Sequence, residues 1–163
     1  MPYVSLDLET TGLDPDNDEI IEVAAVRFDA SGVIDTFQSL VNPDKKLEYR
    51  ISLLTGIDPA ELETAPRFGA IAGDVEAFIG LDPIVGQNPT FDTAFLARKG
   101  VQVFGPTYDT FELAGLLLPG LRERGLGAIA DHLGIEFSNR HRAMADADAA
   151  RSVFVALRQR LAA

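Results

Sequence analysis

An α/β fold with a mixed sheet is predicted from the order of two hydrophobic patterns along the 163-residue chain. Apolar and polar residues alternate in three stretches within residues 3–41, and this period of two is typical of strands. After residue 50, apolar residues recur every three or four positions in several stretches, which is typical of helices. Two short apolar segments separate some of these stretches, and strands that alternate with helices favour an α/β architecture.

The first three strands are expected to form an antiparallel meander, because short polar turns separate them. The segment 13–18 is rich in turn-forming residues, and Asp29-Ala30-Ser31-Gly32 is typical of a hairpin turn. Asn42-Pro43 ends the third strand. The predicted strands span residues 3–9, 19–28 and 33–41.

Glycine and proline bound the later elements. Gly56, Gly100 and Gly134 each follow a predicted helix, and Pro119-Gly120 ends another. Pro66 lies near the start of a predicted helix, where proline is tolerated. The predicted helices span 50–56, 65–79, 90–99, 110–118, 126–133 and 143–161, and the two short strands span 83–86 and 107–109.

The bulk composition is typical of one globular domain, which we assign to residues 1–163. The chain is 47% hydrophobic and 24% charged, and its length can bury a sizeable core. No apolar run approaches the roughly 20 residues of a membrane span, and no secretory signal is visible, so no membrane partner is expected. Cysteine is absent, which excludes thiolate metal sites and fits a reducing compartment. We therefore expect a cytoplasmic protein.

The net charge of −11, from 14 basic and 25 acidic residues, counts against a simple nucleic-acid-binding module. A protein that acts on phosphates must then offset this charge locally, with bound cations or a small basic rim. The six basic residues that could form such a rim, or could be ordinary surface charge, are Arg98, Lys99, Arg122, Arg124, Arg140 and Arg142.

Two carboxylates lie on the same face of the first strand. Asp7 and Glu9 are two residues apart, so their side chains are about 7 Å apart along the strand. Apolar surroundings remove their hydration, and the two charges repel each other. A hard divalent cation such as Mg²⁺, which prefers oxygen ligands, would relieve both costs. The alternative is an exposed face of an edge strand.

Two further carboxylates lie on the apolar side of a helix start. Asp92 shares a helix face with Phe95 and Leu96, and Asp146 lies on the apolar stripe of the last helix. Asp148 lies off that stripe and is expected to be solvated. Asp92 and Asp146 are therefore candidate metal ligands, although a carboxylate in a first turn can also simply complement the helix dipole.

His141 precedes Asp146 by five residues, in the loop that enters the last helix. Histidine changes charge near neutral pH, so it suits a general base; the alternative is a surface residue between two arginines. His132, inside a helix, is expected to be structural or solvated. The four acids and His141 lie at strand ends and helix starts, which converge at one edge of an α/β sheet. Four carboxylates can hold two Mg²⁺ or Mn²⁺ ions about 3.5–4 Å apart, an arrangement that hydrolyses phosphodiesters.

The candidate residues lie in three short motifs. These are Asp7-Leu8-Glu9-Thr10-Thr11-Gly12, Val85-Gly86-Gln87-Asn88 with Phe91-Asp92, and His141-Arg142-Ala143-Met144-Ala145-Asp146. The three motifs resemble those of the DnaQ-like (DEDD) 3′–5′ exonucleases, and a histidine that precedes the last aspartate by five positions is typical of the His-containing subgroup, DEDDh. Each motif is weak alone, whereas all three in this order are specific, and the resemblance covers nearly the whole chain.

The resemblance implies an RNase H-like fold, with a five-stranded mixed sheet whose second strand is antiparallel and which is flanked by helices. It implies His141 as the general base and places Glu9 near the attacking water. The implied ligands of two Mg²⁺ or Mn²⁺ ions are Asp7, Glu9, Asp92 and Asp146, and the implied substrate contacts are Thr10, Leu13, Asn88 and Phe91. Gln87 departs from the histidine that many relatives have, which puts fine substrate contacts in doubt.

The implied activity is a metal-dependent 3′–5′ exonuclease that releases nucleoside 5′-monophosphates from a single-stranded or frayed 3′ end. DNA is the expected substrate, and RNA stays open because no motif reads the 2′-hydroxyl. The sequence is similar to the exonuclease subunit or domain of bacterial DNA polymerase III and to that of DinG-type helicases. A polymerase or helicase is therefore the expected partner, whether the chain is a stand-alone subunit or an excised domain.

Three other functions are weighed against this one. An oligoribonuclease-like exoribonuclease would use the same residues, and a hydrolase of small phosphates would suit the acidic net charge. A non-catalytic domain of the same fold could serve as an interaction platform. The complete set of four carboxylates and His141 argues against that last alternative, because a degenerate domain would be free to lose any of them.

Overall fold

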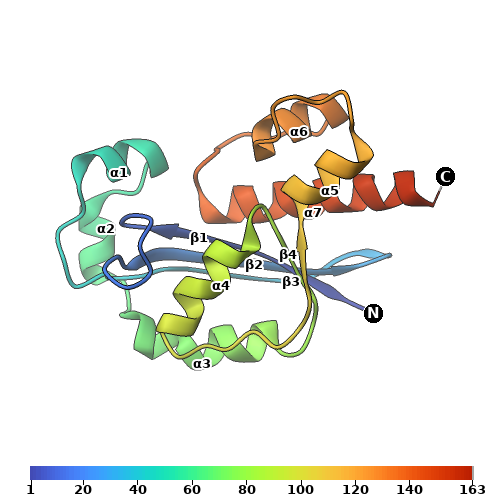
Figure 1. Ribbon diagram of the computed structural model, residues 1–163. Helices are drawn as coiled ribbons and strands as arrows, with labels where there is room; N and C mark the ends of the chain where they lie inside the picture. Colours follow the sequence, from blue (N-terminus) through green and yellow to red (C-terminus); the bar gives the residue numbers. More distant parts are fainter. Residues whose placement is uncertain (163) are drawn as a thin grey trace.

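The computed structural model describes residues 1–162 and contains a five-stranded sheet with helices on both faces (Figure 1). The strand order is β3-β2-β1-β4-β5. β2 is antiparallel to both of its neighbours, whereas β1, β4 and β5 are parallel. The predicted α/β class and the antiparallel second strand are therefore confirmed. The strands are β1 (Tyr3–Thr10), β2 (Ile20–Asp29), β3 (Gly32–Leu40), β4 (Ile84–Gly86) and β5 (Thr107–Asp109).

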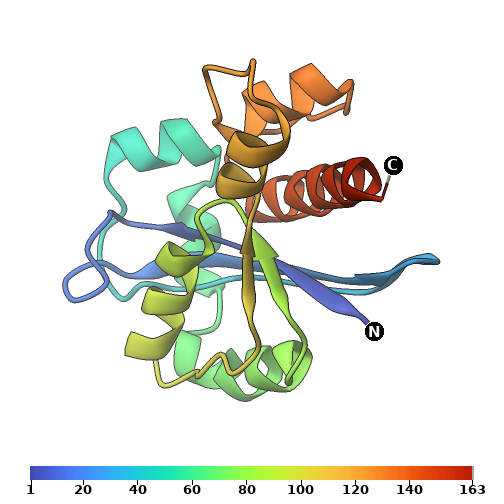
Figure 2. The same ribbon diagram turned by 45° about the vertical axis from the view of Figure 1, so that its right-hand side comes forward.

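The helices form two layers around the sheet (Figures 1 and 2). α3 and α4 cover one face, α7 lies along the other face with α5 and α6 packed on it, and α1 and α2 lie at the end toward which β1 runs. Within residues 1–162, no helix is both long and apolar enough to cross a bilayer. The helices are α1 (Tyr49–Thr55), α2 (Pro59–Thr64), α3 (Phe68–Ile79), α4 (Pro89–Arg98), α5 (Thr110–Leu117), α6 (Leu126–Leu133) and α7 (Ala143–Leu161).

The central strand β1 has two different faces. Val4, Leu6 and Leu8 point into the core formed with α3 and α4. Because side chains alternate along a strand, Ser5, Asp7 and Glu9 point to the opposite face, where α7 lies. The fold therefore places the carboxylates of β1 between the sheet and α7.

Small residues allow α7 to approach the sheet closely. Ala143 and Ala147 of α7 pack against Ala24 and Val26 of β2. The Ser5 hydroxyl on β1 donates a hydrogen bond of 2.7 Å to the carbonyl oxygen of Ala147. These contacts fix the first turns of α7 over the middle of β1.

The helix α2 is absent from the sequence prediction. Its N-cap is Asp58, whose carboxylate accepts a hydrogen bond from the Ala60 N–H at 2.9 Å. Glu61 accepts in return from the Asp58 N–H at 3.3 Å, which completes a capping box. Asp58 followed by Pro59 and Glu61 is itself a helix-start signal, so the sequence contained the information that predicts α2.

The predicted start of the helix 65–79 is wrong. α3 begins at Phe68, and Pro66 lies before it in extended chain. The Asn42 N–H donates to the Pro66 carbonyl oxygen at 2.9 Å, and Asn42 forms a β-bridge with Arg67. Proline disfavours a helical conformation in the preceding residue, which keeps this segment extended and lets it pair with the chain after β3.

We expect Ala147→Leu to lower the free energy of unfolding by about 1–3 kcal/mol, because a larger side chain must be forced between α7 and β2. Ala147 is 0% exposed. Denaturant unfolding measures the change. The control is Ala156→Leu, at a partly exposed position of the same helix, which should shift stability by no more than about 0.5 kcal/mol. Equal losses in the two variants would contradict the close approach of α7.

Candidate active site

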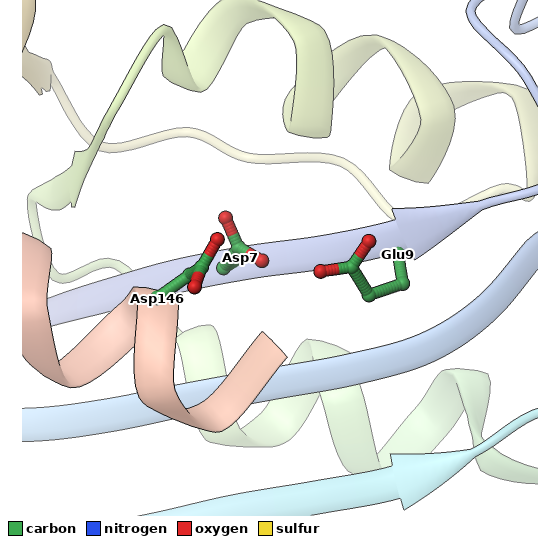
Figure 3. A group of neighbouring side chains, drawn as sticks. All are labelled: Asp7, Glu9 and Asp146. Atoms are coloured by element: carbon green, nitrogen blue, oxygen red, sulfur yellow. The ribbon is translucent and has the colours of Figure 1, made fainter. Parts of the chain in front are cut away.

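Three carboxylates meet at the carboxyl-terminal half of β1. Asp7 and Glu9 project from β1, and Asp146 projects toward them from the first turn of α7 (Figure 3). One carboxylate oxygen from each residue lies within 4.8 Å of the other two. Oxygen atoms at this spacing can bind one divalent cation together, and an all-oxygen ligand set is the type that Mg²⁺ and Mn²⁺ prefer.

Asp92 approaches the same place from the other layer. β4 ends at Gly86, and the N–H of Leu8, further along β1, donates to Asp92 Oδ1 at 2.9 Å. Asp92 is buried in the first turn of α4. It lies outside the group of three oxygen atoms within 4.8 Å, although its charge contributes to raising the pKa of Asp7. The structure thus gathers all four predicted carboxylates, with Asp92 fixed beside the other three by the backbone of β1.

Burial raises the pKa of each of these acids, and neighbouring negative charges raise it further. Burial is the largest cause for Asp7, followed by the charges of Asp92 and Asp146. Burial, then the charge of Asp146, raises the pKa of Glu9 to about 8, and burial raises that of Asp92 to about 8. Burial also raises the pKa of Asp146, against the hydrogen bond that it accepts from the backbone of His141. The metal-free cluster therefore retains protons near neutral pH, which a bound cation would displace.

His141 lies in the loop before α7, as the sequence predicts. It is exposed, and its φ of 66° is in the left-handed region. Its backbone N–H donates a hydrogen bond of 3.0 Å to Asp146 Oδ1. This bond ties the position of His141 to that of a candidate metal ligand, while its role as a general base stays a prediction.

Glu22 is the buried acid of this region that the sequence prediction missed. It is 0% exposed and lies opposite Glu9 in the β1–β2 register. Its carboxylate accepts from both Nε and Nη2 of Arg142 at 3.2 and 3.1 Å, from the Ala143 N–H at 3.3 Å and from Gln38 Nε2 at 2.9 Å. Glu22 therefore joins β2 to the start of α7. The sequence could have identified Glu22 as a buried acid, because it is the one charged residue in the apolar run of residues 20–26.

Thr10 and Leu13, two of the predicted substrate contacts, lie where β1 turns away from the sheet. The Thr10 hydroxyl donates to the Gly12 carbonyl oxygen at 2.6 Å, so it stabilises the turn. The Leu13 side chain is 84% exposed. A large apolar side chain so exposed, four residues after Glu9 in the chain, is available to contact a ligand, and its role stays a prediction.

The other two predicted contacts, Asn88 and Phe91, lie where β4 continues into α4. Asn88 has a φ of 53°, and its N–H donates to Asp109 Oδ1 at 3.0 Å. The Phe91 ring lies 4.9 Å from that of Phe95, centroid to centroid, and is partly buried against the core. Both residues therefore shape the turn that presents Asp92, and substrate contact by either stays a prediction.

Most of the candidate basic rim is neutralised within the described residues. Arg98 pairs with Asp16 at 2.8 Å, and Lys99 pairs with Glu19. The remaining ion pairs of these residues are Arg140 with Asp131 at 3.1 Å and Arg142 with Glu22 at 3.1 Å. Four of the six residues therefore have acidic partners. For these four, ordinary surface charge describes the structure better than a rim that binds phosphate.

Comparison with known proteins assigns the family. The family model RNase_T, described as an exonuclease, matches residues 4–154. The chain belongs to this exonuclease family. The matched residues include all four predicted metal ligands and His141, and the predicted membership of an exonuclease family is confirmed.

Relatives in this family include proteins of the bacterial replicase. DNA polymerase III PolC-type of Oceanobacillus iheyensis is 38% identical over 98% of this chain, which spans only 12% of that protein. DNA polymerase III subunit epsilon of Aquifex aeolicus is 32% identical, and the match covers 98% of this chain and 81% of the subunit. The chain therefore spans a small part of the PolC-type polymerase and most of the epsilon subunit.

Solved structures of the exonuclease family share the fold. E. coli Exonuclease I in complex with a dA16 oligonucleotide has a TM-score of 0.84 and 24% sequence identity, and covers 98% of this chain and 41% of Exonuclease I. Exonuclease X in complex with 5′ overhanging duplex DNA has a TM-score of 0.79 and 21% identity, and covers 97% of this chain and 90% of Exonuclease X. The predicted architecture is confirmed by this likeness.

The metal-free protein is expected to lose stability as the pH rises from about 4.5 to about 8. The pKa of Glu9 rises from 4.5 to about 8 on folding, so the folded state keeps a proton that the unfolded chain releases. This stabilisation is complete below the unfolded pKa and is lost as the pH passes the folded pKa. Mn²⁺, which binds the deprotonated carboxylates, should therefore raise Tm more at about pH 8 than at about pH 5.5.

Thermal unfolding in EDTA and in millimolar Mn²⁺ measures both effects. Asp7→Asn should weaken the pH dependence and the response to Mn²⁺, because it removes one charge and one ligand. Asp148→Asn is the matched control, since Asp148 is half exposed and pairs with Arg151 away from the cluster. A Tm in EDTA that does not fall over this pH range would contradict the assigned pKa shifts.

Proposed function

We propose that residues 1–163 form a single exonuclease domain that hydrolyses phosphodiester bonds from the 3′ end of DNA and releases nucleoside 5′-monophosphates. The observation that carries this proposal is the cluster of Asp7, Glu9 and Asp146 within 4.8 Å, with Asp92 beside it. Family membership supports hydrolysis of nucleic acid. The two structural neighbours named above were solved with DNA, which supports DNA over RNA.

The four carboxylates are proposed to hold two Mg²⁺ or Mn²⁺ ions. Such ions supply positive charge to the reacting phosphate and lower the pKa of bound water. The protein contributes a rigid ligand set, since Asp7 and Glu9 lie on the central strand and Asp146 and Asp92 lie in first turns of helices. Rigid elements hold ligands more accurately than loops do.

His141 is the proposed general base, which removes a proton from the attacking water, and Glu9 orients that water. The exposed position of His141 allows it to pass this proton to solvent. Thr10, Leu13, Asn88 and Phe91 are the proposed contacts of the 3′-terminal nucleotide. Thr10 ends β1 and Leu13 lies in the turn that follows it, so both closely follow Glu9 in the chain, whereas Asn88 and Phe91 lie at the start of α4, close to Asp92 in the chain.

The chain is proposed to act beside a polymerase, as a subunit or as a domain of a longer protein, in the cytoplasm. This proposal rests on two of its relatives, a PolC-type DNA polymerase III and a DNA polymerase III subunit epsilon. A helicase is the second candidate partner, from the resemblance to the exonuclease domains of DinG-type helicases.

We expect the protein with Mg²⁺ or Mn²⁺ to release mononucleotides one at a time from a single-stranded DNA oligonucleotide labelled at its 5′ end. Asp7→Ala should lower this rate at least about 100-fold, because it removes a ligand from the cluster. Gel electrophoresis of the shortened products gives direction and rate. Equal rates of mononucleotide release by wild type and Asp7→Ala would contradict the proposal.

The same assay separates the alternatives. A matched RNA oligonucleotide degraded much faster than DNA would favour an oligoribonuclease-like enzyme. Cleavage of a dinucleotide but not of a 20-mer would favour a hydrolase of small phosphates. No cleavage of any substrate, with the protein folded and Mn²⁺ bound, would favour a non-catalytic domain.

His141→Ala should keep Mn²⁺ affinity within a few-fold of wild type while kcat falls about 10²–10⁴-fold, the usual contribution of a general base. The His141 bond to Asp146 comes from the backbone N–H, so alanine retains it. Calorimetric Mn²⁺ titration and steady-state kinetics measure the two effects. His132→Ala, in α6, is the control and should change neither. A wild-type kcat in His141→Ala would exclude the base role.

A further inference from the structure

Two of the six candidate rim residues, Arg122 and Arg124, have no acidic partner among the ion pairs of residues 1–162. Both lie in the loop between α5 and α6, and Arg122 is exposed whereas Arg124 is partly buried.

Two contacts fix the Arg124 side chain. Its Cζ atom lies 4.2 Å from the centroid of the Phe111 ring, in the first turn of α5. The guanidinium also crosses α5 at Gly115, where a β-carbon would lie only 2.2 Å from Nη1. A guanidinium that stacks on a ring keeps its N–H groups in the plane of the group, where they remain able to bind a phosphate in a bidentate manner.

A third contact fixes the backbone of Arg124. Gln87 Nε2 donates a hydrogen bond of 2.7 Å to the Arg124 carbonyl oxygen, and Gln87 Oε1 accepts from the Thr110 hydroxyl. Gln87 immediately follows β4, and Asp92 lies five residues further along the chain, in the first turn of α4. Because the carboxyl ends of β4 and β5 lie at the same edge of the sheet as the carboxylate cluster, Gln87 holds Arg124 at the edge where the proposed reaction occurs.

We propose that Arg124 binds a backbone phosphate of the nucleic-acid strand, on the 5′ side of the bond that is cleaved. This inference rests on the proposed function of the same site. Gln87, Phe111 and Gly115 are positioning residues that hold the guanidinium in place. The contact reads charge and not base identity, so it binds strands of any sequence. Gln87, where the resemblance led us to expect histidine, thus acts on the strand through Arg124.

Binding of a fluorescein-labelled single-stranded DNA 12-mer tests this inference by anisotropy. The measurement uses His141→Ala protein with Mg²⁺, so that the strand stays intact. Adding Arg124→Gln should weaken binding about 10-fold, as expected for loss of one charge-assisted contact. It should also reduce the slope of log K against log [KCl] by about 0.7, the value for one phosphate of a single strand. Arg122→Gln, which removes the same charge two residues away, is the control and should change binding less than about twofold.

A second pair of variants tests the position of the guanidinium without changing charge. Gly115→Ala should weaken binding by a similar factor, because its methyl group displaces Arg124 from Phe111. Gly73→Ala, on α3, makes the same substitution where a β-carbon meets nothing within 4 Å, and should leave binding unchanged. Circular dichroism verifies that each variant is folded.

The results separate this inference from the proposed function. Equal affinity and equal salt slope with and without the Arg124→Gln substitution would overturn the inference and leave Arg124 a stabilising stack only. Equal losses in Arg122→Gln and Arg124→Gln would also overturn it, since they would show a general effect of charge. Failure of wild type to cleave the 12-mer, with Arg124-dependent binding intact, would count against the exonuclease and not against the phosphate contact.

Discussion

Electrostatic repulsion among closely spaced carboxylates is the constraint on which the rest of this structure depends. The partly buried Asp7, Glu9 and Asp146 hold oxygen atoms within 4.8 Å of one another, and the buried Asp92 adds a fourth carboxylate. Such a group opposes folding whenever its members are ionised, as their raised pKa values show. The surrounding fold must therefore hold the acids in place more strongly than they repel. Binding sites are commonly built this way, with local strain supported by the rest of the protein.

Two features of the sheet supply this support. The short β4 leaves the N–H of Leu8 to bond Asp92, so a carboxylate from α4 reaches β1 through the place where a longer strand would continue. The small residues of α7 let its first turn lie against β1, and the Ser5 hydroxyl fixes that approach. Strand length and side-chain size, rather than any special loop, thus determine how close the four acids lie.

The sequence predicted most elements and all four acids, because alternation and helical spacing report directly which side chains face the core. The sequence-based prediction was wrong or incomplete where a feature depends on contacts between segments that are distant in the chain. Pro66 disfavours a helical conformation in Ala65, but the start of α3 at Phe68 also depends on backbone pairing of Asn42 with the segment around Pro66, which no local pattern reveals. Glu22 resembled one polar residue in a strand, and its importance comes from Arg142, which is 120 residues away. The helix α2 is different, because the local sequence Asp58-Pro59 with Glu61 indicates a helix start and the prediction did not use it.

The pairing of Glu22 with Arg142 also affects which positive charges of this acidic protein are available to bind the phosphates of a nucleic acid. Arg142 adjoins His141 and would be a natural phosphate ligand, but a fully buried carboxylate left without its partner would be costly, so Glu22 retains the guanidinium. Arg98, Lys99 and Arg140 also pair with acids, but the acids of these pairs are partly or largely exposed. Four of the six candidate rim residues thus balance acids of the protein itself. In the proposed function, cations bound by the cluster would supply most of the attraction for a phosphate, and Arg124, which has no acidic partner among the ion pairs of residues 1–162, would add to it.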